Sequence, residues 1–523
     1  MSTSGSWWLL LLGLVLAVAL EIAGAGAPEA EAADHGTIDE AVTALDDLAT
    51  AHWNEAGLEP AEEAPALTVA RRLSLALTGS IPSLEEIRAI EGLPRRAAIT
   101  AHLDRLLHSR RSADYLAERL ARAFVGTDEG PFIVFRRRRF VHWLSDALAE
   151  GRPYDALVRE MVASEGLWTD APATNFITGH DRDPVKLTAR TTRAFLGMRL
   201  DCAQCHDHPF AHWKQADFEG LAAFYGGIRQ TLTGIEDSDE AFHPGGRMMM
   251  MADDAPAAVP TVPFAREALP EGGRRREQLA AWITSPDNPA FGKAIASRIW
   301  TLMVGRAPSR SGVDDIEGDM RLPGLLDHLA YDFVGHGHDL RRLIRIIALS
   351  RPFGVAAEPD PSPRSVAFAA FPMVALRPEQ IAGALVQLAD LHTVDAESHV
   401  LLKLMRFGNT RDFTERYGDA GESELDEQAG TIMQRLVLMN GKVARERVEA
   451  NIFTAAGRIA GLAQSDERRL DTLFTVSLSR LPSEAERALF ASWLAGAKGE
   501  GRMKAMEDVL WTLVNSTEFS WSH

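Results

Sequence analysis

The two cysteines of the chain stand three positions apart and are followed directly by a histidine. Cys202 and Cys205 are the only cysteines among 523 residues, and His206 completes the segment Cys202-Ala203-Gln204-Cys205-His206. At this spacing two thiols can attach covalently to the vinyl groups along one edge of a haem, while the adjacent imidazole binds the iron. The pattern predicts haem c, with Cys202, Cys205 and His206 as its binding residues.

The same residues suit two other kinds of site. Two thiols at this spacing can close a small disulfide in an exported protein. They can also bind zinc when histidines complete the shell, and His206, His208 and His212 are the metal-ligand candidates in this segment. The sequence leaves haem, zinc and a structural disulfide open, with haem as the first hypothesis.

A second axial ligand for a haem iron would have to come from another part of the chain. His208 lies two positions from His206, on the same side of the iron, and so cannot serve from the opposite face. The remaining candidates are His180, His212, His243 and the run Met248 to Met251, and the sequence favours none of them.

No other stretch of the sequence carries a recognisable catalytic motif. A nucleophile elbow, a phosphate-binding loop and a zinc-protease helix are all missing, so the sequence assigns no enzyme class. Asp314, Asp315, Glu317 and Asp319 lack the regular ligand spacing of a calcium loop and indicate a solvated acidic turn.

The overall charge argues against nucleic acid as a partner. The net charge is −18, whereas general affinity for phosphates depends on clustered Lys and Arg that outweigh local acid. Arg136 to Arg139 form the one notable basic run, but four consecutive residues point around the whole circumference of a helix. A solvated or salt-bridged helix is therefore expected there.

The N-terminus has the features of an export signal. Leu9 to Leu20 form an apolar core of 12 residues, followed by small residues that offer cleavage sites before position 33. This run is shorter than a bilayer requires, so we expect membrane association only through residues 1–33, and only if they stay uncleaved. Export to the periplasm or cell envelope also suits covalent haem attachment and disulfide formation, which occur outside the bacterial cytoplasm.

The rest of the chain shows helical periodicity and almost no alternation typical of strands, which predicts a mainly α fold with little or no β-sheet. Residues 34–65, rich in Ala, Glu and Pro, suggest a flexible linker with one short helical pattern around Ile38 to Leu48. Residues 229–275 lose the helical period and predict a second linker between two helical domains, 66–228 and 276–523. Ser83 and Ser483 each start a helix with a capping box, because a glutamate follows three positions later.

Several phrases resemble a known pair of bacterial domains. The first half resembles the planctomycete-type cytochrome-like (PSCyt-type) domain, and the second half resembles the planctomycete-specific C-terminal (PSD-type) domain, a family without an established function. The matching phrases in the first half are Arg71-Arg72-Leu73-Ser74-Leu75, Phe195-Leu196-Gly197, the run from Cys202 to Phe210, and Leu221-Ala222-Ala223-Phe224-Tyr225. Those in the second half include Arg298-Ile299-Trp300, Gly305-Arg306, Arg480-Leu481-Pro482 and the ending from Leu510 to Phe519. The resemblance implies export and association with a bacterial envelope.

Two functions from different classes follow from these observations. The first is an exported c-type haem protein that passes electrons to or from a redox partner protein. The second is an envelope binding or scaffold protein, in which the Cys/His cluster is a structural disulfide or a zinc site.

Overall fold

The computed structural model describes most of the chain beyond the N-terminal segment. The described residues are 36–129, 135–207, 212–244, 256–359, 361–394, 413–419, 421–423, 425, 431–451, 454–462 and 465–523. The predicted export signal, residues 1–33, lies outside them. Residues Ile38–His523 form one compact unit.

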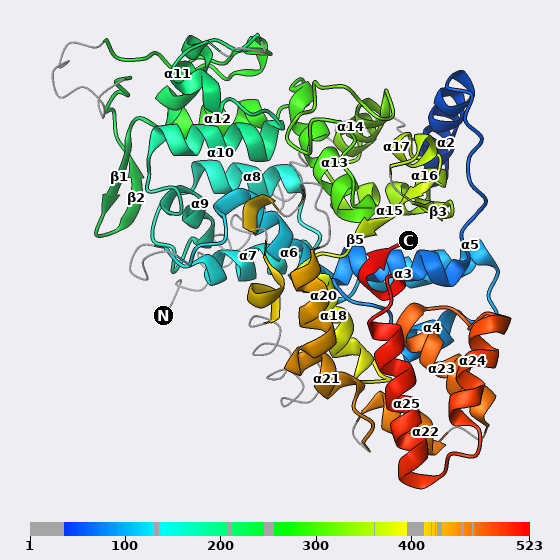
Figure 1. Cartoon of the computed structure of the whole chain (residues 1–523). Coiled ribbons are helices and arrows are strands. Elements are labelled where there is room, and N and C mark those ends of the chain that lie inside the picture. The colour runs from blue at the N-terminus through cyan, green and yellow to red at the C-terminus, as the bar shows by residue number, and fades with distance from the viewer. Residues whose placement is uncertain are drawn as a thin grey trace, which may run out of the picture. The chain divides into compact units, whose positions relative to one another are not determined.

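The mainly α fold predicted from the sequence is confirmed (Figure 1). The helices before the irregular stretch at 229–275 are α2 (Ile38–Glu55), α3 (Ala66–Thr78), α4 (Leu84–Ile90), α5 (Arg95–Leu107), α6 (Arg110–Val125), α7 (Arg137–Ala149), α8 (Tyr154–Ala163), α9 (Asn175–Thr178), α10 (Pro184–Leu196) and α11 (Gln215–Ala222). The next group is α12 (Arg275–Ile283), α13 (Pro289–Val304), α14 (Leu325–Gly335), α15 (Leu340–Leu349), α16 (Arg351–Gly354), α17 (Pro363–Val366) and α18 (Pro378–Leu388). The last group is α20 (Ile432–Asn440), α21 (Lys442–Val448), α22 (Ala455–Leu462), α23 (Asp466–Leu478), α24 (Glu484–Leu494) and α25 (Gly499–Val514).

Short 3₁₀ turns and small sheets connect these helices. The 3₁₀ turns are η1 (Pro172–Thr174), η2 (Asp201–Gln204), η3 (Ala223–Tyr225), η4 (Arg266–Ala268), η5 (Gly421–Ser423) and η6 (Glu518–Ser520). Among the described residues the sheets have two strands each: β1 (Ile228–Thr231) pairs antiparallel with β2 (Gly234–Asp237), β3 (Ala357–Glu358) pairs parallel with β4 (Phe371–Pro372), and β5 (Val374–Ala375) pairs antiparallel with β6 (Trp521–Ser522). The β1–β2 hairpin lies almost wholly inside the predicted linker, so part of that stretch has regular structure.

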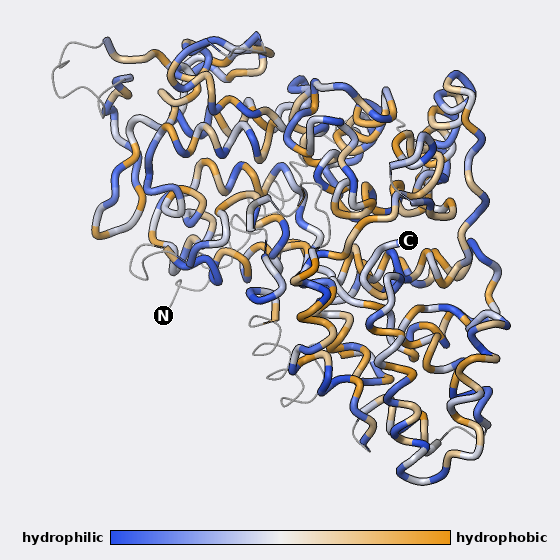
Figure 2. The backbone as a smooth tube through the Cα atoms, viewed as in Figure 1, coloured by the Kyte–Doolittle hydropathy of each residue, from blue (hydrophilic) through white to orange (hydrophobic). Residues whose placement is uncertain are grey.

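Local sequence signals explain where many of the helices begin. The side chain of Ser83 accepts a hydrogen bond from the backbone N–H of Glu86, and the Glu86 carboxylate accepts one from the backbone N–H of Ser83. Ser483 and Glu486 repeat this arrangement at the start of α24. Both capping boxes predicted from the sequence are therefore confirmed. Apolar residues recur among polar ones along most of the helices (Figure 2), and recurrence at every third or fourth position gives a helix an apolar face to bury.

The segment expected as a flexible linker, residues 34–65, contains the 18-residue helix α2, which starts where the short helical pattern was predicted and runs further, to Glu55. Leu45, Ala49 and Trp53 are completely buried on one face of it, and the Trp53 indole N–H donates to the Ala367 carbonyl at 2.8 Å. The helix packs against α15. The Ala- and Glu-rich composition hid this docked face from a reading based on composition alone.

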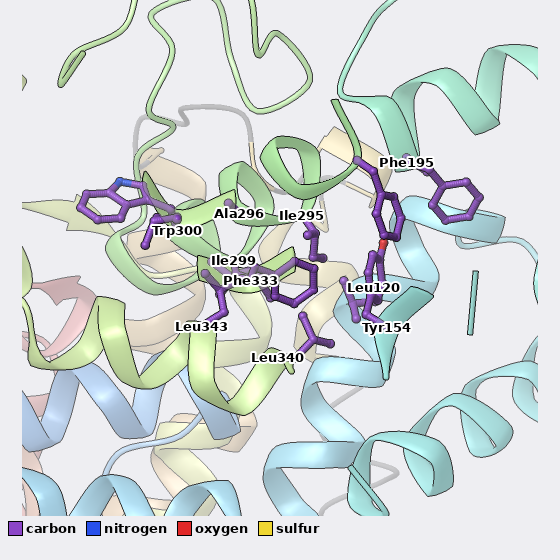
Figure 3. Close-up of a cluster of buried hydrophobic side chains, with 14 of the residues drawn as sticks. Leu120, Tyr154, Phe195, Ile295, Ala296, Ile299, Trp300, Phe333, Leu340 and Leu343 are labelled. Atoms are coloured by element: carbon purple, nitrogen blue, oxygen red, sulfur yellow. The ribbon is translucent and has the colours of Figure 1, made fainter. Parts of the chain in front are cut away.

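The larger hydrophobic core draws on both sides of the predicted 229–275 linker. It includes buried residues from Ala41 to Phe371. Figure 3 shows Leu120, Tyr154 and Phe195 beside Ile295 and Phe333 of the later helices. The Tyr154 ring stacks on the Phe291 ring, with centroids 5.4 Å apart. The predicted domain boundary therefore does not coincide with a break in the core.

The second hydrophobic core belongs to the C-terminal helices. It runs from Leu376, between β5 and α18, to Phe519, and it also includes Leu75 and Ile81 from the N-terminal half. Along the chain, residues of the larger core give way to residues of the second core between Phe371 and Leu376. This point lies well after the irregular stretch at 229–275. Helix α3 contributes to both cores and so joins them.

Candidate functional site

The cysteine motif lies on a short turn directly after α10. The Asp183 side chain caps α10 by accepting from the backbone N–H of Val185 at 3.0 Å. The helix ends at Gly197, whose φ of 61° is left-handed. A Cβ atom at that position would lie 2.6 Å from the Ile316 side chain, so both the backbone angle and the space require glycine. The chain then enters the turn η2, which carries Cys202.

The turn presents both thiols to solvent. Leu200 and Ala203 are buried, at 1% and 0% exposure, and the Ala203 N–H donates to the Leu200 carbonyl at 2.9 Å. Cys202 and Cys205 stand on either side of the buried alanine, and both are exposed and free. Leu200 and Ala203 anchor the turn, and the thiols of Cys202 and Cys205 remain accessible to a reagent or a cofactor.

The imidazole of His206 is exposed and contacts the backbone next to it. Its Nδ1 lies 2.7 Å from the backbone carbonyl of Asp207, and because a carbonyl oxygen only accepts, Nδ1 is the donor of this hydrogen bond. This contact leaves Nε2 as the nitrogen through which the neutral ring could bind a metal. The Asp207 carboxylate accepts from the backbone N–H of Gln215 at 3.0 Å, which ties the motif to the first turn of α11.

Of the other two predicted metal ligands, His208 and His212, the structure describes only His212. His208 lies outside the described residues. His212 is exposed, and its ring packs on the Trp213 ring with centroids 4.2 Å apart. In the part of the chain that the structure describes, no three His, Cys, Asp or Glu side chains gather into a group that could hold a metal ion.

The candidates for a second axial ligand are also separated by the fold. His180 is 8% exposed, and its Nε2 lies 2.8 Å from the Phe124 carbonyl, so this imidazole serves to join α6 to the end of α9. His243 is exposed. Met248 to Met251 lie outside the described residues.

The loop after α13 contacts the end of α10, which leads into the cysteine turn. The Ile316 N–H donates to the Gly197 carbonyl at 3.2 Å. The Asp314 carboxylate lies 2.6 Å from the Arg298 guanidinium and 3.3 Å from that of Arg193 on α10. Burial alone would raise the pKa of Asp314, but these arginines and Arg199 hold it below its usual value. The solvated acidic turn expected here is wrong for Asp314, because its arginine partners come from distant segments.

The arginine run at 136–139 has the salt-bridged character that the sequence predicted. The guanidinium of Arg137 donates to both oxygens of the Glu118 carboxylate, at 2.9 and 3.0 Å. Arg137 is buried, whereas Arg138 and Arg139 are exposed. Arg137 therefore links α7 to α6.

A cavity of about 280 Å³ adjoins the segments on either side of the motif. Its apolar walls include Met198, Trp213, Phe264 and Ile316. Met198 lies between the end of α10 and the cysteine turn, and Trp213 lies just before the start of α11. Sequence patterns gave no sign of the cavity, because its walls come from segments that are far apart in the chain.

No helix among the described residues is long and apolar enough to cross a membrane.

Comparison with known proteins gives two matches. Residues 44–230 match the family model PSCyt2, described as a protein of unknown function (DUF1549), and residues 275–405 match PSD1, also described as a protein of unknown function (DUF1553). No curated protein and no solved structure matches the chain. The chain therefore carries a PSCyt2-type region at residues 44–230 followed by a PSD1-type region at residues 275–405, in the order that its motifs indicate.

Proposed function

We propose that the protein is an exported c-type haem protein that exchanges electrons with a partner protein. The observation that carries the proposal is the turn at 202–206. Two exposed, free thiols flank a buried alanine, and the next imidazole contacts the backbone through Nδ1, which leaves Nε2 for an iron.

The donor set fits the chemistry of haem attachment. Thioether formation requires thiols that the vinyl groups can reach, and both cysteines are on the surface. Ligation requires an unprotonated ring nitrogen, and the contact of Nδ1 with the Asp207 carbonyl leaves Nε2 for that role in the neutral ring. A haem held there would supply one-electron transfer. Cys202 and Cys205 would anchor it, and His206 would bind its iron.

Export follows from the same proposal. Covalent haem attachment takes place outside the bacterial cytoplasm, and residues 1–33 have the composition of an export signal. We place the mature protein in the periplasm or cell envelope.

The test is the absorbance of the full chain purified from a host that matures c-type cytochromes. We expect a Soret band that survives extraction with acidified acetone. Replacing both cysteines, Cys202→Ser and Cys205→Ser, should abolish the covalent band. His206→Ala should leave the band covalent but change the spin state, because anchoring and ligation are separate tasks.

A matched variant and metal analysis separate the haem proposal from its alternatives. His108→Ala changes an exposed imidazole outside the motif, directly after α5, and should leave the spectrum as it is. Protein that carries stoichiometric zinc and no haem, despite the maturation machinery, would replace the proposal with a zinc site. A Cys202–Cys205 disulfide in protein without haem or metal would favour the scaffold function instead.

A further inference from the structure

The cavity beside the cysteine turn combines apolar walls with two carboxylates. Trp213 and Phe264 lie with ring centroids 6.2 Å apart and form its aromatic side. Asp217 and Glu317 also line it. At about 280 Å³ it is close to the lower end of small-molecule sites, roughly 300 Å³, and suits a body of about one ring.

The groups that could attract an anion are already engaged. Lys293 is the one lysine or arginine among the described residues of the lining, and its ammonium nitrogen lies 2.5 Å from the Asp327 carboxylate. Helix α13 starts at the cavity, but Pro289 has no N–H to offer, and the N–H of Ala290 donates to the Asn288 side chain at 3.1 Å. The charge of Lys293 is therefore compensated by Asp327, and the first turn of α13 offers no N–H from Pro289 or Ala290 to an anion.

The negative groups keep acceptor capacity. The Asp217 carboxylate accepts from the backbone N–H of Lys214 through Oδ2, at 2.9 Å, and its Oδ1 has capacity for a further donor. Glu317 is exposed, on the loop next to the buried Ile316. The net charge of −18 adds a field that attracts cations.

We propose that this cavity binds a small organic cation, an ammonium group carried on an aromatic or apolar body. The body would lie against Met198, Trp213 and Phe264, and the ammonium would face Asp217 and Glu317. The proposal does not rest on haem attachment, because none of these contacts involves Cys202, Cys205 or His206.

Both family regions contribute to the site. Met198, Trp213 and Asp217 belong to the PSCyt2 region, whereas Lys293 and Glu317 belong to the PSD1 region. Neither region alone forms the complete cavity, so the proposed binding site requires both regions.

The test uses calorimetric titration of the full chain with three probes of similar shape: benzylamine, benzyl alcohol and benzoate. We expect benzylamine to bind about tenfold more tightly than benzyl alcohol, and benzoate not to bind, because the two carboxylates attract an ammonium and repel a third carboxylate. Glu317→Gln should reduce that preference severalfold without changing the affinity for benzyl alcohol.

Two further variants complete the design. Glu271→Gln changes an exposed carboxylate outside the cavity and should leave benzylamine affinity unchanged. Ala290→Leu fills part of the cavity and should weaken both benzylamine and benzyl alcohol, with the melting temperature as the check that the variant folds. The proposal is overturned if no probe binds, if benzoate binds best, or if Glu317→Gln leaves the preference for benzylamine intact.

Discussion

His102 is a buried imidazole that the fold keeps neutral. It is 1% exposed on α5, and its Nε2 lies 2.8 Å from the Ser74 hydroxyl on α3. Burial lowers its pKa to about 4, because desolvation penalises the charged form more than nearby Glu86 favours it. The unfolded chain takes up a proton near the ordinary pKa of about 6.5, so stability that is present above pH 6.5 decreases as the pH falls toward 4.

We predict that the free energy of unfolding falls by about 2 kcal/mol between about pH 7 and pH 5 through this residue alone. Urea unfolding at the two pH values measures the change. His102→Gln keeps a hydrogen-bonding group but cannot ionise, so it should flatten this part of the pH dependence. His142→Gln, at an exposed position, should retain the wild-type slope. Equal slopes for His102→Gln and the wild type would refute the assignment.

Helix α3 depends on two adjacent arginines whose guanidinium groups donate to backbone carbonyls. Arg72 donates to the carbonyls of Phe353, Val355 and His523 at 2.7 to 2.8 Å, and its guanidinium lies 3.7 Å from the centre of the Phe371 ring. Arg71 donates to the carbonyls of Ser477 and Phe519. The phrase Arg71-Arg72 from the resemblance is therefore structural, because it ties α3 to segments 281 to 451 positions later.

We predict that Arg72→Lys lowers the free energy of unfolding by about 2 to 4 kcal/mol, because one ammonium cannot replace the planar set of donors inside the protein. Chemical denaturation measures the loss. Arg88→Lys is the matched control, since Arg88 forms an exposed pair with Glu91 and should change stability by less than about 0.5 kcal/mol. Similar small effects at both positions would show that the carbonyl contacts contribute little.

The elements that the sequence predicted well are those set by neighbouring residues. The capping boxes at Ser83 and Ser483 depend on contacts within a few positions. Helix α2 was predicted in part, from Ile38 to Leu48, although the apolar residues Leu45, Ala49 and Trp53 recur every four positions along its full length. The ion pairs of Asp314 and the walls of the cavity were not, because they join segments that only the tertiary fold brings together.

At the scale of the whole molecule, the composition of the N-terminal segment leads to a prediction about where the protein resides. We predict that the mature protein begins after the Ala-rich stretch near residue 33 and is released from the membrane, because Leu9 to Leu20 is shorter than a bilayer requires. Intact mass of protein extracted from the envelope measures the start. A retained Met1 in the membrane fraction would mean that the segment acts as an anchor.

Because the larger core includes residues of both family regions, a second prediction concerns the stretch between them. Its Gly, Pro and polar composition still predicts that a protease cuts first within residues 226–275. Cleavage there should not separate the halves, because Tyr154 stacks on Phe291 and α8 packs on α12 across the cut. The buried apolar contacts between α10 and α13 would also remain in place.

Limited proteolysis followed by gel filtration tests this directly. We expect two bands on a denaturing gel, both eluting together in native buffer at the volume of the intact chain, and separating only in denaturant. A Phe291→Ala variant, which removes the ring stacked on Tyr154, should be destabilised by about 3 to 5 kcal/mol, and its nicked halves should separate at a lower denaturant concentration. Halves that elute apart without denaturant, each still folded, would show two independent domains and would mean that the shared core contributes little to holding the regions together.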